Sequence, residues 1–195
     1  MKGGRLKRGF KKRCEEKSVE LRNQLGLTSH DRLLSESLAD HLGITIDHPE
    51  DIPDLDDKYI KRLVDDDPFS WSAVTITTDG HTFIISNSRH SASRHESNFM
   101  HELSHVILEH SPVRIKAAPG FPFPMREDRR DDEEEAEWLG GCLQIPRDGL
   151  LWALKRNMSD SRSDDRFGSS VDMVRFRRNM TGVDKQFKRL RRYPR

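Results

Sequence analysis

Leucines at helical spacing mark the first amphipathic segment of the chain. Gly43 follows them and is typical of a helix end, so the pattern predicts a helix over residues 29–42. A weaker, mostly charged helix is predicted before it, over residues 11–27. The acidic, proline-punctuated stretch at 48–69 suits a surface loop around one short helix at 58–64.

β-branched and aromatic residues on both sides of Asp79 and Gly80 predict two antiparallel strands. This residue pair suits the positive φ angles of a two-residue hairpin turn. Further along, Ser93 and Glu96 have the spacing of a capping box, and apolar residues follow at helical spacing. We therefore expect a hairpin followed by a helix over residues 93–109.

The second half of the chain is interrupted by proline, glycine and charge. A proline- and glycine-rich loop is predicted at 111–128, followed by a second helix that ends before Pro146. Residues 159–165 are polar and are expected to form a flexible link. Residues 167–183 have the apolar spacing of a short amphipathic helix, and the basic stretch from 185 on is predicted to be frayed.

Composition limits the class of protein. The 195 residues are 33% hydrophobic and 34% charged, which favours one compact domain with solvated edges and excludes a large two-domain enzyme. The formal net charge is only +1, so no overall field drives binding to nucleic acid or to a membrane. Clusters of lysine and arginine in the first and last segments leave DNA binding possible but not favoured.

Secretion and membrane insertion are not expected. The basic start is not followed by the apolar stretch of a signal peptide, and no run approaches the roughly 20 apolar residues of a membrane span. Cys14 and Cys142 lie far apart and form neither a disulfide framework nor a CxxC metal motif. We therefore expect a soluble, cytoplasmic protein without a membrane partner.

The sequence His101-Glu102-Leu103-Ser104-His105 is an HExxH motif in the middle of a predicted helix. Positions i and i+4 lie one turn apart on the same face, so both imidazoles can bind one Zn²⁺ ion while Glu102 faces a metal-bound water. Zinc lowers the pKa of that water to about 7, and the carboxylate can take its proton, which creates a nucleophile for a peptide carbonyl. The motif therefore predicts a zinc site with Glu102 as general base.

A catalytic zinc site generally has three protein ligands and keeps a fourth position for water. The metzincin class, which has Gly and His after the motif, is excluded by Leu108 and Ser111. A glutamate of the second helix is the alternative, and the candidates there are Glu133, Glu134, Glu135 and Glu137. Helical geometry alone leaves Glu133 and Glu135 open, because each lies on a side of this helix that also carries small or apolar residues.

HELSHVILEH is followed by a proline-rich loop and by EEEAEWLGGCLQIP. These segments are similar to the pattern HELGH, a gap, and E-x-x-A with a closing LL-x-P, which is that of the ImmA/IrrE family of zinc metallopeptidases. The resemblance covers about residues 33 to 183. The upstream ADHLGITI is also similar to the family, and the downstream RFGSSVDMVRFRRNMTGV resembles half of a helix-turn-helix. Glu109 stands where the family often has a histidine, and His110 follows one position later.

The resemblance implies which residues form the site. His101 and His105 would be zinc ligands and Glu102 the general base. Glu133 is selected as third ligand because it stands three residues before Ala136, as in the E-x-x-A pattern.

These patterns together predict an α+β, zincin-like fold. A short antiparallel sheet or hairpin would pack on the HExxH helix and on a second, glutamate-bearing helix, with a C-terminal helical segment. The expected division is a basic, partly helical extension at 1–27, the metallopeptidase domain at 28–154, and a linker, helix-turn-helix-like segment and basic tail at 155–195.

The function implied by the resemblance is an intracellular zinc endopeptidase. Its protein substrate would be a helix-turn-helix transcriptional repressor, cleaved to derepress phage, mobile-element or stress genes. The alternative is a non-proteolytic regulator that binds DNA or a repressor and holds zinc structurally. Glu102 discriminates between the two, because a structural site prefers four protein ligands and needs no base beside the ion.

Overall fold

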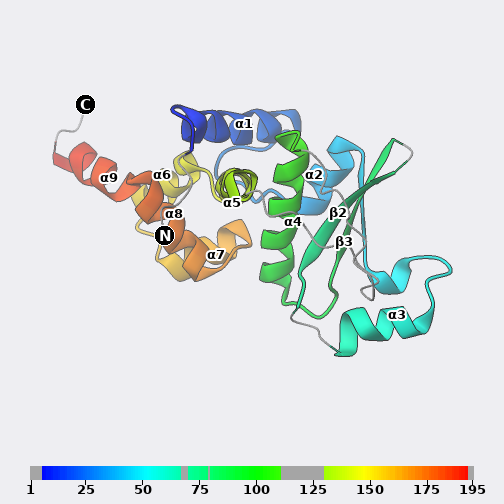
Figure 1. Cartoon of the computed structure of the whole chain (residues 1–195). Helices are drawn as coiled ribbons and strands as arrows, with labels where there is room; N and C mark the ends of the chain where they lie inside the picture. Colours follow the sequence, from blue (N-terminus) through cyan, green and yellow to red (C-terminus); the bar gives the residue numbers. More distant parts are fainter. Residues whose placement is uncertain (1–5, 67–69, 79, 111–129, 193–195) are drawn as a thin grey trace.

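The computed structural model describes residues 6–66, 70–78, 80–110 and 130–192. The predicted α+β class is confirmed: a small sheet lies on one side of the molecule and a group of helices on the other (Figure 1). Asp79 of the hairpin turn and the whole proline-rich loop predicted at 111–128 lie outside the described residues. Among the described helices, none combines the length and the apolar character that a membrane span requires.

The sheet is mixed, with the strand order β1-β3-β2. β2 (Ala73–Thr78) and β3 (His81–Ser86) form the predicted antiparallel hairpin, in which Thr78 pairs with His81. β1 (Ile44–Asp47) pairs with β3 in parallel, so the expectation of a purely antiparallel sheet is wrong. Four residues directly after a helix are too few to show a strand periodicity in the sequence.

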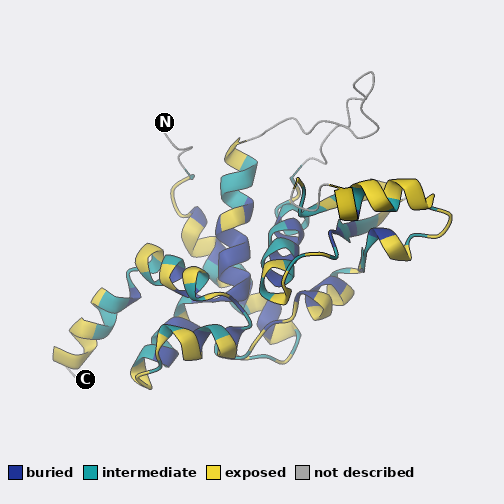
Figure 2. Ribbon diagram, turned by 90° about the horizontal axis from the view of Figure 1, so that it is seen from below, coloured by how far each residue is buried: buried dark blue, intermediate teal, exposed yellow. Residues whose placement is uncertain are grey.

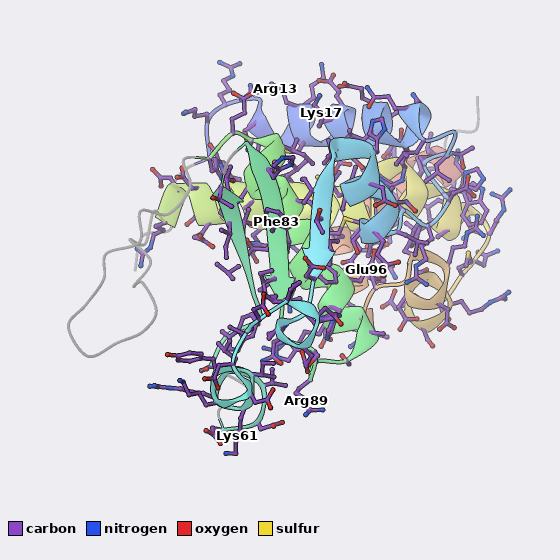
Figure 3. All side chains as sticks on the ribbon, turned by 90° about the vertical axis from the view of Figure 1, so that its right-hand side faces the viewer. Arg13, Lys17, Lys61, Phe83, Arg89 and Glu96 are labelled. Atoms are coloured by element: carbon purple, nitrogen blue, oxygen red, sulfur yellow. The ribbon has the colours of Figure 1, made fainter. Side chains whose placement is uncertain are left out.

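α4 (Ala92–Ile107) lies along one face of this sheet, and α5 (Arg130–Gln144) packs on the opposite side of α4 (Figure 1). The other face of the sheet carries the exposed Val74 and Ile76 of β2 and is turned toward the viewer in Figure 3. α4 therefore lies between the sheet and α5 and contacts both.

Shorter helices precede the hairpin. α2 (Ser35–Leu42) ends at Gly43 in the left-handed conformation (φ 68°), as the sequence predicts. A 3₁₀ turn at Pro49–Asp51 is followed by α3 (Asp57–Lys61). A π-helical turn continues α3 at Arg62–Asp66, so the predicted short helix at 58–64 is confirmed within a few residues.

The predicted capping box at the start of α4 is wrong. Ser91 is the N-cap residue and makes no side-chain cap bond. Glu96 instead accepts hydrogen bonds from the backbone N (2.7 Å) and the Oγ (3.0 Å) of Ser35 in α2. Burial raises the pKa of the Glu96 carboxyl, although the bonds from Ser35 oppose that change. The glutamate faces a neighbouring helix, which the spacing within one helix does not reveal.

One apolar core joins α1 (Phe10–Gln24) to the helices and the sheet around α4. α1 crosses α5 and contributes Phe10, Cys14 and Leu21 to this core. Figure 2 shows α5, the helix that follows the longest grey segment, buried over most of its length and exposed in its first turn. Burial raises the pKa of the Cys14 thiol to about 12, so this cysteine is a neutral core residue.

Two buried arginines bind the carbonyl groups at the end of α5. Arg22 of α1 donates from Nη2 to the carbonyl of Leu143 at 2.6 Å. Arg177, which lies in α8, donates from Nε to the carbonyl of Ile145 at 3.0 Å. The end of a helix leaves its last carbonyl groups without partners inside the helix, and these side chains supply the missing donors. Burial lowers the pKa of Arg22 to about 10.

The C-terminal part of the described chain is helical throughout most of its length. α6 (Arg147–Lys155), α7 (Asp160–Phe167), α8 (Val171–Thr181) and α9 (Val183–Arg192) surround a second apolar cluster. The predicted amphipathic helix at 167–183 corresponds to α8.

Two expectations for this region are wrong. The residues expected to form a flexible polar link belong to α7, because Ser159 caps the helix by accepting a bond from the N–H of Arg162 and Phe167 is fully buried. The stretch expected to be frayed forms α9 up to Arg192. α9 is held by a hydrogen bond of 2.5 Å from Arg147 Nη2 to Gln186 Oε1, which local sequence does not predict.

Candidate metal centre

Two histidines of α4 and one glutamate of α5 face each other where these helices meet. His101 and His105 lie one turn apart, with their Nε2 atoms 3.1 Å from each other. Glu133 places Oε2 3.2 Å from Nε2 of His101 and Oε1 3.6 Å from Nε2 of His105. In the described part of the chain, these three side chains form the one cluster whose potential ligand atoms lie close enough together for a metal ion.

The spacing of these donor atoms fits a tetrahedral metal ion. Ligand atoms at about 2.0–2.2 Å from a tetrahedral zinc ion lie about 3.3–3.6 Å from one another, close to the distances between these three side chains. The side chains of His101 and Glu133 are 28% and 30% exposed, so solvent and a substrate can reach the site. Two imidazole nitrogens and one carboxylate oxygen are also a donor set that zinc has in hydrolases.

The other candidate glutamates of α5 lie elsewhere. Glu135 points to His110, with Oε2 3.4 Å from Nε2 of that ring. Glu137 is exposed, and neither Glu137 nor Glu134 belongs to the cluster of potential ligands. Of the two residues that helical geometry leaves open, the structure therefore brings Glu133 to the imidazoles.

A glycine allows α5 to approach α4 closely. A Cβ atom on Gly140 would lie 3.1 Å from the carbonyl oxygen of Met100 and 3.3 Å from the backbone N of His101. Ala136, one turn earlier, is fully buried. The small residues at these two positions set the distance between the helices beside the potential ligands.

Glu102 lies on the side of α4 that faces the sheet. Its side chain is only 6% exposed, and its Oε2 accepts a hydrogen bond of 2.6 Å from Thr75 Oγ1. Thr75 belongs to β2, which is an edge strand within the described part of the chain, so this bond holds the carboxylate between α4 and that strand. Sequence reasoning did not identify Thr75; a polar residue on the strand face that packs against a helix is the signal that could have found it.

The family of the chain follows from comparison with known proteins. A model of the IrrE N-terminal-like domain, Peptidase_M78, matches residues 51–179, which is most of the chain. The chain belongs to this family. The resemblance recognised from the HExxH and E-x-x-A motifs is thereby confirmed, and membership in this peptidase family implies a metallopeptidase. Comparisons with the curated proteins and with the solved structures gave no match.

The part that matches the M78 family contains the whole candidate site. It begins at residue 51 and therefore includes β2, β3, α4 and α5, which position Glu102 and the three potential ligands. α1 lies outside the match, although it packs on α5 and shares its core. The family model thus covers the peptidase elements, and a helix beyond it supports their position.

His110 makes a contact within this M78 domain that sequence reasoning missed. Its Nδ1 lies 2.9 Å from Nδ1 of His105, on the side of that ring opposite to Nε2. In the sequence, His110 differs from the other histidines only in that it follows, by one position, the place where the family often has a histidine. Its side chain is 8% exposed.

Three further histidines gather at the start of α4. The ring centroid of His95 lies 5.6 Å from that of His48 and 6.1 Å from that of His90. Burial, together with these two neighbouring imidazoles, lowers the pKa of His95 below its usual value. Of these three histidines only His95 lies in α4, six residues before the first histidine of the M78 motif, and the group is not part of the candidate metal centre.

Proposed function

We propose that this protein is an intracellular zinc endopeptidase. The observation that carries this proposal is the convergence of His101, His105 and Glu133, with donor atoms 3.1 to 3.6 Å apart, beside the buried carboxylate of Glu102. Membership in a peptidase family supports the reaction class, and the nitrogen and oxygen donors support zinc as the ion.

The chain's own residues would supply binding and proton transfer. His101, His105 and Glu133 would hold the ion, which when bound polarises the peptide carbonyl and acidifies water. Glu102 would take a proton from the attacking water and pass it to the leaving amine. Thr75 would orient this carboxylate through the bond that it donates to Oε2. No acyl-enzyme forms in such a reaction.

A catalytic role agrees better with the site than a structural one. A structural zinc site is usually closed by four protein ligands, whereas three potential ligands come together in the described residues. The exposed parts of His101 and Glu133 leave the site open to solvent. A structural site also needs no base beside the ion, whereas the motif places Glu102 directly after His101.

The substrate that we propose is a helix-turn-helix transcriptional repressor, whose cleavage would derepress phage, mobile-element or stress genes. Among the described strands, β2 pairs with β3 alone, and this supports a protein substrate because an extended peptide can add to an open strand edge by main-chain hydrogen bonds. Thr75 on that strand contacts Glu102, so a peptide bound along β2 would lie beside the general base.

The decisive experiment replaces the general base alone. Glu102→Gln should lower the cleavage rate on the order of a hundredfold or more, because an amide of nearly the same shape cannot accept the proton. The substrate would be a candidate helix-turn-helix repressor, incubated with purified protein and analysed by mass spectrometry of the fragments.

Zinc content, measured on the same samples, is the control. Glu102→Gln should retain about one zinc ion per chain, since Glu102 is not placed among the potential ligands. Cleavage at the normal rate by this variant would contradict the assignment of the base. Absence of zinc from the wild-type protein would contradict the proposed enzyme.

A further inference from the structure

We propose that His110 and Glu135 are positioning residues that fix the tautomer and the ring orientation of the metal ligand His105. The inference rests on the proposed function, because it requires that His105 binds the ion. Neither residue is assigned a role by the HExxH motif or by the E-x-x-A pattern. Together they would form a relay from the ligand to a carboxylate on the neighbouring helix.

The three side chains lie in line behind the site. His105 directs Nε2 toward His101 and Glu133, and its Nδ1 lies 2.9 Å from Nδ1 of His110. Nε2 of His110 in turn lies 3.4 Å from Oε2 of Glu135. The side chains of His110 and Glu135 are 8% and 19% exposed, so water competes little for these contacts.

The backbone after α4 brings His110 to this place. Glu109 has the left-handed conformation (φ 54°), which is uncommon for a residue other than glycine. The chain therefore folds back, and the N–H of His110 donates to the carbonyl of His105 at 3.0 Å. The two imidazole rings then lie 5.0 Å apart between centroids, at an angle of 68°. The uncommon backbone conformation of Glu109 thus places the ring of His110 against that of His105.

The contacts allow only one arrangement of ring protons when Nε2 of His105 binds a metal. Nδ1 of His105 must then carry the proton, and it donates to Nδ1 of His110. His110 must accept at Nδ1 and carry its own proton on Nε2, which donates to the carboxylate of Glu135. Each ring is thus held in a single tautomer by the next group in the relay. Metal-binding histidines usually have such a partner for their second nitrogen, and its loss costs about 10–100-fold in metal affinity.

Glu135 also extends the relay to α5, the helix that carries Glu133. Two glutamates that lie two positions apart in α5 therefore serve different purposes: Glu133 contacts the potential ligands directly, and Glu135 contacts His110. The first contact joins α4 to the first turns of α5, and the second joins the segment just after α4 to the same turns.

The test measures metal binding, not activity. His110→Phe keeps a ring of similar size but removes the acceptor, and it should raise the zinc Kd about 10–100-fold in a chelator competition assay. Glu135→Ala should raise the Kd in the same direction by a smaller factor. His110→Asn should restore part of the affinity, because its side-chain oxygen can accept from Nδ1 of His105. The visible spectrum of the Co²⁺-loaded protein should change in His110→Phe, as the ligand ring is free to rotate.

Controls separate this proposal from general destabilisation and from the proposed function. Glu137→Ala, an exposed glutamate of the same helix, should leave the Kd and the spectrum unchanged. If His110→Phe does not fold, Glu135→Ala decides, since alanine favours helix and leaves no oversized side chain to accommodate. Normal zinc affinity in both variants would overturn the relay and leave the peptidase intact. Failure of the wild-type protein to bind zinc would overturn both.

Discussion

Glu133 differs from its glutamate neighbours in its distance to both imidazoles of the HExxH motif. One carboxylate contacts two rings, at 3.2 Å and 3.6 Å, and each oxygen faces a different histidine. A carboxylate in this position balances part of the charge of a divalent ion and closes the donor set from a second helix. The residue is therefore expected to matter for metal binding in a way that its neighbours do not.

Replacement of Glu133 by alanine should remove most of the bound zinc, because only two protein donors remain. Zinc content per chain, measured by elemental analysis after dialysis, checks this prediction. Glu134→Ala and Glu137→Ala change the net charge equally and serve as matched controls that should retain zinc. A variant at 133 that keeps full zinc content would show that another group completes the site.

At the scale of elements, the sequence predicts the helices and strands whose formation depends on residues close to one another in the chain. The helix carrying His101 and His105 and the hairpin are local patterns, and both are confirmed. β1 and α7 were not predicted, because a four-residue strand has no periodicity and α7 depends on burial of Phe167 against other helices. The candidate site shows the same division.

The pair of histidines at i and i+4 is local and visible in the sequence, whereas the selection of Glu133 required a family pattern. The contact between His110 and Glu135 could not be predicted at all. It depends on the left-handed backbone at Glu109, and no glycine marks that position.

The close approach of α4 and α5 at Gly140 predicts that a larger residue there weakens zinc binding. Gly140→Ala should weaken zinc binding by several-fold, because the added Cβ would press on the backbone at Met100 and His101 and move α5, with Glu133, away from α4. Chelator competition gives the Kd. Gly141→Ala is a matched control, since its Cβ would meet the side chain of Arg177 at 3.0 Å and not the backbone of α4. Equal effects of the two substitutions on zinc affinity would contradict this explanation.

The histidines at the start of α4 predict a dependence of stability on pH. The pKa of His95 is lowered in the fold by burial and by His48 and His90, so the unfolded chain binds more protons. The free energy of unfolding should therefore be highest above the ordinary pKa, near 6.5, and should fall as the pH drops from about 7.5 to 5. Urea titrations of metal-free protein test this.

His95→Gln should show a smaller loss of stability over the same pH range, because the group that takes up the proton is removed. His81→Gln, at the exposed first position of β3, is the control and should behave as the wild type. An unchanged pH dependence in His95→Gln would assign the effect to another group.

At the scale of the whole molecule, α5 connects the peptidase elements to the first and last parts of the described chain. α1 and α8 both bind its C-terminal carbonyl groups, through Arg22 and Arg177, while its first turns carry Glu133. The N-terminal end of α5 therefore carries the potential ligand Glu133, and its C-terminal end is held by Arg22 and Arg177. Stability and metal binding should respond to different substitutions.

Arg22→Leu tests the anchoring end. It keeps an apolar volume but removes the donors to buried carbonyl groups, and it should lower the free energy of unfolding by about 2–4 kcal/mol. Urea unfolding of metal-free protein measures this loss. Lys17→Leu, an exposed cation of the same helix that pairs with Glu20, should change the stability by less than about 0.5 kcal/mol. A loss of similar size in both variants would contradict the role of Arg22.

His101 and Glu133 lie 32 positions apart in the sequence, so a metal ion bound by both would also stabilise the fold. An ion held by both helices is a cross-link that exists only in the folded chain, and at a free concentration a thousand times its Kd it would add about 4 kcal/mol to stability. A cell short of zinc would then lose more than the activity of existing molecules. Metal-free chains would open more often and be degraded by housekeeping proteases, so the abundance of the protein would itself report the supply of the metal.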